Sequence, residues 1–449
     1  MQNIFTPEKL FLIIALTFGV LLAIFTPPYQ IPDEPQHFYR ALSITENKII
    51  STKMNNNTGN YLPADLDEIH EKYVPMIKNL DKKTSFKDFK NSLKYKYNRN
   101  KQIFFNFPNT ALYSPVCYIP QIIGIIISRL FTNSLVAILL FGRLFSLFFF
   151  IAMGYISIKT IPILKWGIFL VLLTPMNLII SSGFSADTVL LSLSIFYFTK
   201  VLQCYFQETT LSNKKIFILA LIALLIALCK QSFLFTLFIF IIPVKKFGSN
   251  SAFKIATIII PALTTSIIWA LMVKNIYIPL NNADVIDQIL YIIHHPFEYL
   301  TVLFKPTFDS LIILFEAICI MGWLEMSVPK YYYFIYIVLF ILNALLITNT
   351  NNLKIKIQTN IKFIILTLLN YVAISTLLYL SWAPPGNFYP TMVLQGRYFS
   401  ILLLPLMTML YATFSYTNKK LKQVLNIATV LFVIAILTQV TYTIIIRYY

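Results

Sequence analysis

The chain has 449 residues, of which 57% are hydrophobic and only 12% are charged, and its formal net charge is +18. A soluble domain carries about 25% charged residues, so this composition excludes a soluble globular protein. The Lys and Arg residues are dispersed among the connections between apolar segments, which excludes a nucleic-acid-binding protein with one basic face. We therefore expect an all-α polytopic membrane protein.

The apolar segments predict the membrane-spanning helices, because a bilayer crossing needs about 20 apolar residues. In chain order they are Leu10–Phe25, Leu135–Ile158, Trp166–Ile180, Thr188–Phe206, Ile216–Val244, Ile255–Val273, Tyr331–Thr348, Phe363–Trp382, Phe399–Tyr416 and Val424–Ile446. One further run, Val116–Leu130, is shorter. The sequence thus predicts about eleven helices, and the topology depends on whether Val116–Leu130 crosses the membrane.

The positive-inside rule favours an interfacial position for Val116–Leu130. With the N-terminus in the cytoplasm, every short basic connection then lies inside. These connections carry Lys159, Lys165, Lys214, Lys215, Lys245, Lys246, Lys254, Lys354, Lys356, Lys362, Lys419, Lys420 and Lys422. The arrangement requires Ile216–Val244 to enter and leave on the same side, as two short helices broken near Cys229–Ser232. If Val116–Leu130 crossed, most of the short basic connections would face outward.

This topology leaves two long segments outside the membrane, at residues 27–113 and 274–330. The first contains 13 Lys or Arg residues, but a loop of this length is largely exempt from the charge rule. We expect interfacial helices in it. Two shorter external connections follow from the same topology, at Ser181–Asp187 and Ala383–Tyr398. No internal repeat divides the chain, so residues 1–449 are expected to form a single transmembrane domain.

The first candidate site follows the first span, in the stretch FTPPYQIPDEPQHFYRA. Asp33 can cap a helix that begins here, and helical spacing then places Asp33, His37 and Arg40 on one face, with Glu34 at its edge. One interpretation is a capped interfacial helix whose charges meet water. The other is a fixed functional constellation, and the prolines that flank the acidic pair favour it.

Two further candidates lie at the predicted external ends of other spans. Asp187, in SSGFSADTVLLS, either supports a helix N-terminus or provides a second carboxylate facing Asp33, able to hold a divalent cation or a sugar hydroxyl. Arg397, in VLQGRYF, lies on the side where the charge rule disfavours it. It either extends toward lipid headgroups or, with Gln395, binds a phosphate. Lys230, in the predicted helix break, is a further candidate for substrate binding.

Taken together, PPYQIPDEPQHFYRA, SSGFSADTVL, CKQSFL, MGWLEMSVP and QGRYFSILLLPL resemble a family of bacterial polytopic membrane proteins. That family is known only as a domain of unknown function and is grouped with the GT-C glycosyltransferases. The resemblance runs over nearly the whole chain in the same order. It implies a single GT-C-like transmembrane domain in the bacterial cytoplasmic membrane, with the active site on the external face.

The resemblance also implies a function. GT-C enzymes use lipid-linked sugar donors and carry an acidic motif in the first external loop, which corresponds here to Asp33 and Glu34. A second acidic position corresponds to Asp187. The expected activity is inverting transfer of a sugar from a polyprenyl-phosphate donor to an envelope glycan or lipid acceptor. Asp33 is the expected base, supported by Glu34, and Arg397 and Arg40 are the expected phosphate ligands.

Two matters stay open at the level of sequence. The acidic motif is Asp-Glu without an Asp-x-Asp pattern, so the reaction either needs no metal or uses Mg²⁺ or Mn²⁺ bound by Asp33, Glu34 and Asp187. The alternative functions are a transporter or flippase of lipid-linked glycans and a glycan polymerase. A transporter would need charged residues and discontinuous helices at mid-membrane, for which the break at Cys229–Ser232 is the available feature.

Overall fold

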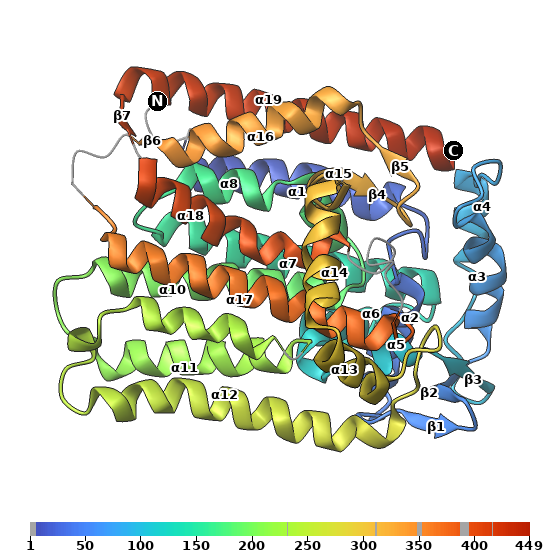
Figure 1. Ribbon diagram of the computed structural model, residues 1–449. Coiled ribbons are helices and arrows are strands. Elements are labelled where there is room, and N and C mark those ends of the chain that lie inside the picture. Colours follow the sequence, from blue (N-terminus) through green and yellow to red (C-terminus); the bar gives the residue numbers. More distant parts are fainter. Residues whose placement is uncertain (1–5, 231, 310–311, 348–352, 387–394, 415) are drawn as a thin grey trace.

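The computed structural model describes residues 6–449 apart from 231, 310–311, 348–352, 387–394 and 415, and its long helices lie side by side in one bundle (Figure 1). In the described ranges, seven helical stretches are long and apolar enough to cross a membrane. They are α1 (Pro7–Phe25), α7 (Leu135–Thr160), α10 (Ala186–Phe206), α12 with η5 (Ser251–Ile276), α17 (Ile357–Trp382), η7 with α18 (Gly396–Phe414) and α19 (Lys419–Tyr448). This confirms a mostly helical, polytopic membrane protein.

Several other expected spans are shorter than predicted. The run Trp166–Ile180 forms two helices, α8 (Lys165–Leu172) and α9 (Pro175–Ser181). The interruption precedes Pro175, because a proline disfavours helical backbone at the residue before it and lacks an N–H for the ladder. The expected span near Tyr331–Thr348 is the 16-residue helix α16 (Lys330–Leu345). In the described chain, seven helices rather than about eleven therefore have the length of a full crossing.

The segment Ile216–Val244 reverses direction, as its lysine-flanked ends predicted. It consists of α11 (Asn213–Leu228) and the 3₁₀ helix η3 (Phe233–Ile241). The Leu211 N–H donates to the Lys246 carbonyl at 2.7 Å, so the two ends of the hairpin meet. The turn includes Lys230, whose φ of +50° lies in the left-handed region. Both ends of this segment therefore emerge at the same end of the bundle.

The short run Val116–Leu130 does not form a crossing helix. It forms η2 (Pro115–Tyr118) and the ten-residue helix α6 (Ile119–Ser128). At 1.5 Å per residue α6 is about 15 Å long, half of the ~30 Å hydrocarbon core. It lies against α7: a Cβ on Gly124 would be 2.7 Å from the Phe141 carbonyl oxygen, so only glycine permits this approach. The predicted topology required a short helix at this position.

The first external segment, residues 27–113 in the predicted topology, contains a small β-sheet that no sequence pattern predicted. Its strands β1 (Thr52–Met54), β2 (Asn57–Pro63) and β3 (Gln102–Asn106) pair antiparallel in that order, with Gly59 opposite Asn106. A helix, α2 (Glu34–Thr45), forms where an interfacial helix was expected, but nine of its twelve residues are buried in the protein. The remaining elements are α3 (Asp65–Tyr73), η1 (Val74–Met76), α4 (Phe86–Ser92) and α5 (Pro108–Ala111). The strands were missed because three to seven residues with irregular burial give little period-two signal.

The second external segment packs against the first. It contains α13 (Val285–His294), α14 (Pro296–Asp309), α15 (Ile312–Cys319), β4 (Ile320–Met321) and β5 (Met326–Ser327). The Thr58 hydroxyl donates to the Ile276 carbonyl at 2.7 Å, which joins the sheet to the end of η5 (Lys274–Ile276). The Gly386 N–H donates to Gln288 Oε1 at 3.1 Å. The connections that are predicted to be external thus gather at one end of the bundle, on the right in Figure 1.

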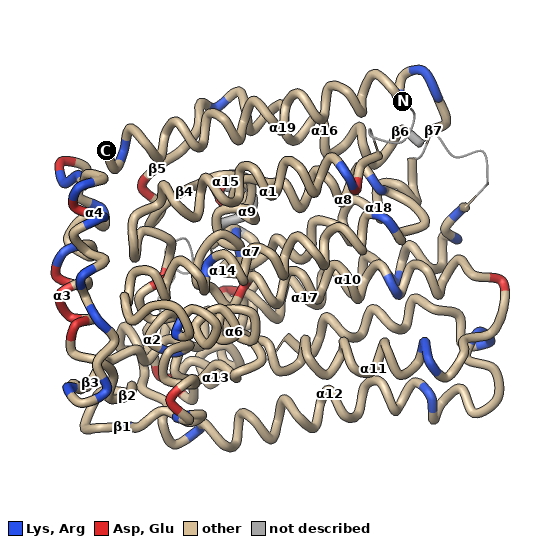
Figure 2. Tube along the Cα trace, turned by 180° about the vertical axis from the view of Figure 1, so that it is seen from behind, with Lys and Arg blue, Asp and Glu red and all other residues tan. Residues whose placement is uncertain are grey.

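The basic connections gather at the opposite end. The Lys246 ammonium, in η4 (Val244–Phe247), donates to the Gln207 carbonyl at 2.6 Å. The Lys356 N–H donates to the Tyr205 hydroxyl at 3.3 Å. The two-residue strands β6 (Leu346–Ile347) and β7 (Tyr416–Thr417) also pair at this end. Figure 2 shows lysines and arginines on these connections, so the separation of the two ends agrees with the predicted topology.

The sidedness of the two ends is a testable prediction from the positive-inside rule. In a chain without the native cysteines, we expect Lys215→Cys and Lys356→Cys to react only with membrane-permeant maleimides in intact cells. We expect Lys96→Cys, which is exposed at the other end, to react with an impermeant maleimide. Reaction of Lys215→Cys with the impermeant reagent in intact cells would refute the topology.

Candidate functional site

A cavity of about 730 Å³ lies at the end of the bundle where the external segments gather. Its wall comes from the first external segment, from the α11–η3 turn and from the adjoining ends of α10, α12, α17 and η7. Most of this wall is apolar, with side chains such as Leu190, Trp269 and Ile374. Five residues predicted from the sequence line it: Asp33, His37, Asp187, Lys230 and Arg397. The fold therefore brings together residues from four distant parts of the chain.

Four charges in the cavity form two ion pairs. Arg397 binds the Asp33 carboxylate through Nη2, and the Lys230 ammonium binds the Asp187 carboxylate. Tyr398 joins the pairs, because its ring centroid lies 5.1 Å from Lys230 Nζ and 5.0 Å from the Arg397 guanidinium carbon. Arg397 also donates to the Tyr398 hydroxyl at 3.0 Å. The site therefore has two cations next to each other, each balanced by a carboxylate.

The backbone is unusual at one member of each pair. Asp33 has φ +59° and Lys230 has φ +50°, in the left-handed region that costs an L-residue about 1–2 kcal/mol. Strained residues of this kind concentrate at functional sites. Asp33 occupies the N-cap position of α2, as predicted, but its side chain accepts no capping hydrogen bond from the helix. Its carboxylate is directed to Arg397 instead.

The protonation states in the first external segment follow from burial and charge. Burial, together with the nearby Lys230 charge, lowers the pKa of His37 to about 3, so the imidazole is neutral at pH 7. His37 Nδ1 shares a 2.7 Å hydrogen bond with the Tyr118 hydroxyl. Burial alone would raise the pKa of Asp33, but the charge of Arg397, its hydrogen bond to Asp33 and the other nearby charges together hold that pKa below its ordinary value. Asp33 is therefore ionised at neutral pH.

Asp187 lies in the first turn of α10 and also contributes its carboxylate to the cavity. Its N–H donates to the Ser185 hydroxyl at 3.1 Å, so Ser185 is the N-cap of α10. The Asp187 carboxylate turns toward Lys230, and its Oδ2 has no hydrogen-bond partner among the described residues. The charges of Asp33 and Asp187 both act on His37. As the sequence predicted, Asp187 and Asp33 border the same cavity.

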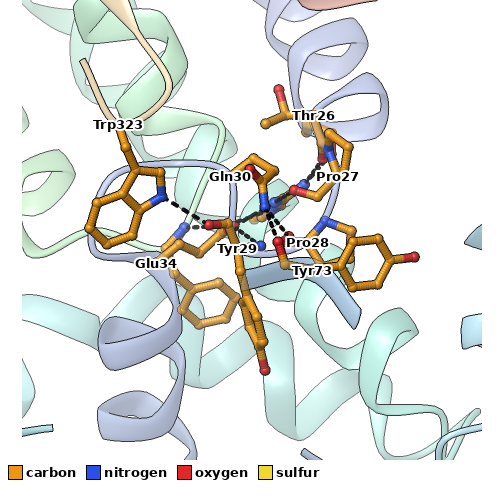
Figure 3. Close-up of polar contacts among 11 residues, drawn as sticks. Thr26, Pro27, Pro28, Tyr29, Gln30, Glu34, Tyr73 and Trp323 are labelled. Atoms are coloured by element: carbon orange, nitrogen blue, oxygen red, sulfur yellow. Dashed lines mark hydrogen bonds and ion pairs between the residues drawn. The ribbon is translucent and has the colours of Figure 1, made fainter. Parts of the chain in front are cut away.

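Glu34 does not lie in the cavity. Its side chain is fully buried, and Arg143 in α7 binds it with Nε at 2.7 Å and Nη2 at 2.6 Å. It also accepts the N–H groups of Tyr29 at 2.9 Å and Phe184 at 3.2 Å. Figure 3 shows Glu34 among the backbone of the Thr26–Gln30 turn, where Trp323 donates to the Tyr29 carbonyl. The predicted supporting or metal-binding role of Glu34 is wrong, because four donors already occupy its carboxylate.

Arg40 is also a structural residue rather than a phosphate ligand. Its Nη2 donates to the carbonyls of Ile49 at 2.7 Å and Tyr113 at 2.8 Å, and its side chain is fully buried. Burial lowers its pKa to about 10, so it remains a cation that ties α2 to the following loop. Gln395 is half-buried and is not part of the cavity wall. The predicted substrate contacts of these two residues are therefore not supported.

The carboxylates do not converge on a common point. Asp33, Glu34 and Asp187 are each paired with a different cation. Within the described residues, no group of three or more His, Cys, Asp and Glu side chains could hold a metal ion. A cation bound jointly by the three predicted carboxylates does not fit this arrangement, because Glu34 faces Arg143.

The family model described as Predicted membrane protein (DUF2142) matches residues 16–410. The chain belongs to the DUF2142 family. No curated protein and no solved structure is significantly similar to it. The matched range includes all five predicted residues that line the cavity, whereas α19 lies beyond it.

Two parts of this DUF2142 site were not predicted. Arg143 is the only charged residue in the apolar run Leu135–Ile158. An isolated charge within a predicted span is costly unless it is paired, so it could have indicated a buried ion pair. Tyr113 and Tyr398 flank Lys230, with ring centroids 5.3 and 5.1 Å from its ammonium. No sequence pattern distinguished them from the many other tyrosines of the chain, so only the fold identifies them.

Proposed function

We propose that this DUF2142 protein is a GT-C-type membrane glycosyltransferase. It would move a sugar from a polyprenyl-phosphate donor to a hydroxyl of an envelope glycan or lipid, on the external face of the bacterial cytoplasmic membrane. The observation that carries this proposal is the pairing of Asp33 with Arg397 beside Lys230 and Asp187, in one cavity with apolar walls. A carboxylate base and two cations are the groups that transfer from a lipid phosphate requires.

The cavity wall supports a lipid-linked donor. Leu377 on α17 and Ile286 on α13 both line the cavity, and 49% and 72% of their surfaces are exposed. Large apolar side chains that are exposed on a membrane protein can contact lipid chains without cost. Exposed apolar side chains at the cavity wall suit a donor whose prenyl chain stays in the bilayer.

The proposed reaction uses the two cations and one carboxylate. Asp33 accepts the proton of the acceptor hydroxyl as its oxygen attacks the anomeric carbon, and the bond from that carbon to the phosphate oxygen breaks. Arg397 and Lys230 stabilise the charge on the departing phosphate, and a guanidinium suits phosphate because it can bind two oxygens at once. A positioned general base accelerates such a step about 10²–10⁴-fold.

The ion pair between Asp33 and Arg397 implies that donor binding precedes activation of the base. While Arg397 is paired with Asp33, it lowers the pKa of Asp33, which makes Asp33 a weaker base. A bound phosphate competes with Asp33 for Arg397 and adds negative charge nearby, and both effects raise the pKa of Asp33. Donor binding thus strengthens the base before the acceptor reacts.

This order predicts a difference between two pH profiles. Activity is lost as the pH falls through the pKa of the base, and kcat/KM reports the free protein whereas kcat reports the substrate complex. We therefore expect the acid limb of kcat to lie at higher pH than the acid limb of kcat/KM. Arg397→Gln should move the kcat/KM limb to higher pH, whereas Arg99→Gln, which changes an exposed arginine, should not. Coincident limbs in the wild-type protein would contradict the exchange of Arg397 between Asp33 and phosphate.

The second candidate is a transporter or flippase, which the interrupted α11–η3 hairpin with Lys230 in its turn favours. Purified protein in liposomes with a panel of radiolabelled polyprenyl-phosphate sugars separates the two functions. A glycosyltransferase releases polyprenyl phosphate and forms a glycosylated acceptor, or hydrolyses the donor slowly without one. A flippase moves the donor between leaflets intact, and that result would refute the proposed function.

A further inference from the structure

A strongly basic segment, Met76–Lys101, lies outside the cavity and takes no part in the proposed reaction. It contains nine Lys or Arg residues and two Asp residues, and all nine cationic side chains are exposed. Lys87 and Lys90 on α4 and Lys94 just beyond it are spaced to share one helical face. The neighbouring helix α3, in contrast, has four acidic residues among its nine. Positive charge is therefore concentrated on one part of the external segment.

The basic segment is fixed across the carboxyl end of α19, as Figure 2 shows beside the C label. The Thr84 N–H donates to the Tyr448 carbonyl at 2.8 Å. The Arg447 guanidinium donates to the carbonyls of Met76 at 2.7 Å and of Asn79 and Lys82 at 3.0 Å. These contacts hold the segment at a defined height on the bundle.

The basic segment lies level with the end of the apolar surface of α19. Large side chains exposed along α19 include Val424, Ile427, Leu431, Tyr442 and Ile446, and this face must contact lipid in a membrane. The Lys83 ammonium donates to the Ile446 carbonyl at 2.9 Å, so the basic segment begins where the lipid-facing surface of α19 ends.

The end of α1 places the segment at the same level. Phe25, the last residue of α1, contacts Phe86 with ring centroids 6.0 Å apart, and Phe86 stacks on Tyr449 at 4.7 Å. Phe86 and Leu80 are 58% and 61% exposed among the lysines. Exposed aromatic and aliphatic side chains mixed with lysines are typical of a surface that lies on a bilayer, whereas a soluble polyanion needs only the charges.

We propose that Met76–Lys101 is a docking surface for the anionic headgroups of membrane lipids beside α1 and α19. Lysines at headgroup level attract anionic lipids, and the attraction is screened by salt. The exposed apolar side chains Leu80 and Phe86 enter the boundary between headgroups and acyl chains. This proposal does not depend on the glycosyltransferase activity.

Site-specific quenching in nanodiscs tests the proposal. A fluorophore on Asn91→Cys reports on α4, and one on Glu68→Cys reports on the acidic helix α3; both positions are exposed, and the four native cysteines are buried. The full-length protein is placed in phosphatidylcholine nanodiscs containing equal fractions of either nitroxide-labelled phosphatidylglycerol or nitroxide-labelled phosphatidylcholine. At position 91 we expect phosphatidylglycerol to quench at least threefold more strongly, and at position 68 we expect no preference.

Charge variants identify the cause of the preference. Lys87→Gln with Lys94→Gln should reduce the phosphatidylglycerol preference at position 91 at least twofold, and Lys87→Arg with Lys94→Arg should retain it. About 1 M salt, where the Debye length falls to about 3 Å, should remove most of it. Equal quenching by the two lipids in the wild-type background would overturn the anionic selectivity. No quenching by either lipid would place α4 away from the headgroups and leave a soluble anionic partner as the occupant, which would also overturn the proposal.

Discussion

Asp33→Asn should lower the rate of sugar transfer at least 10²-fold, because it removes the proposed general base. The protein should stay folded. Asn adopts the left-handed backbone at φ +59° nearly as readily as Asp, and its amide oxygen still accepts a hydrogen bond from Arg397. The change therefore replaces a charged hydrogen bond by a neutral one and should lower the free energy of unfolding by about 1 kcal/mol. The amide has no useful proton affinity, so position 33 can no longer accept the proton of the acceptor hydroxyl.

The measurement compares transfer rates and thermal unfolding of the wild-type and variant proteins. Asp81→Asn is the matched control, because it removes the same charge from an exposed position of the same external segment. Wild-type transfer by Asp33→Asn in a donor-dependent assay would eliminate Asp33 as the base. Addition of Mg²⁺ or Mn²⁺, compared with a chelator, tests the metal alternative in the same experiment.

Arg143→Met should be the most destabilising change at the site, at about 3–5 kcal/mol, because it leaves the Glu34 carboxylate buried without its cation. Removing both charges with Glu34→Gln and Arg143→Met should cost less than the sum of the single changes. Recovery should be incomplete, because Arg143 also donates to the carbonyls of Ala23, Thr26 and Pro27.

Equilibrium unfolding in mixed detergent measures the four members of this double-mutant cycle. Arg99→Met is the matched control: 64% of the Arg99 side chain is exposed, and its partner Glu46 keeps a second cation, Arg129 at 2.9 Å, so we expect less than about 1 kcal/mol. Additive effects of Glu34→Gln and Arg143→Met would show that the two groups do not stabilise each other. The pair lies outside the cavity but supports its wall, since Glu34 adjoins Asp33 and accepts the Phe184 N–H three residues before Asp187.

Several features of the fold were accessible from the sequence because they depend on local composition. Apolar runs of sufficient length predict helices wherever the chain lies in the bundle. The lysines at both ends of Ile216–Val244 predicted a hairpin, and the hydrogen bond between Leu211 and Lys246 confirms it. The small β-sheet escaped prediction, because its strand pairing joins Asn57–Pro63 to residues some 40 positions later, a contact that no local pattern encodes.

The sequence predicted which charged residues form the site, but it did not predict which of them form ion pairs with one another. Asp33, Asp187 and Arg397 stood out as charged residues at the predicted external ends of spans, Arg397 against the positive-inside rule, and Lys230 stood out in a predicted helix break. Their pairing was decided by tertiary structure: Arg397 is 364 residues from Asp33, and Glu34, adjacent to Asp33, turns instead to Arg143. Asp33 has left-handed backbone and Glu34 begins α2, so the two neighbouring carboxylates leave the chain in different directions, and only the tertiary structure decides which cation each one meets.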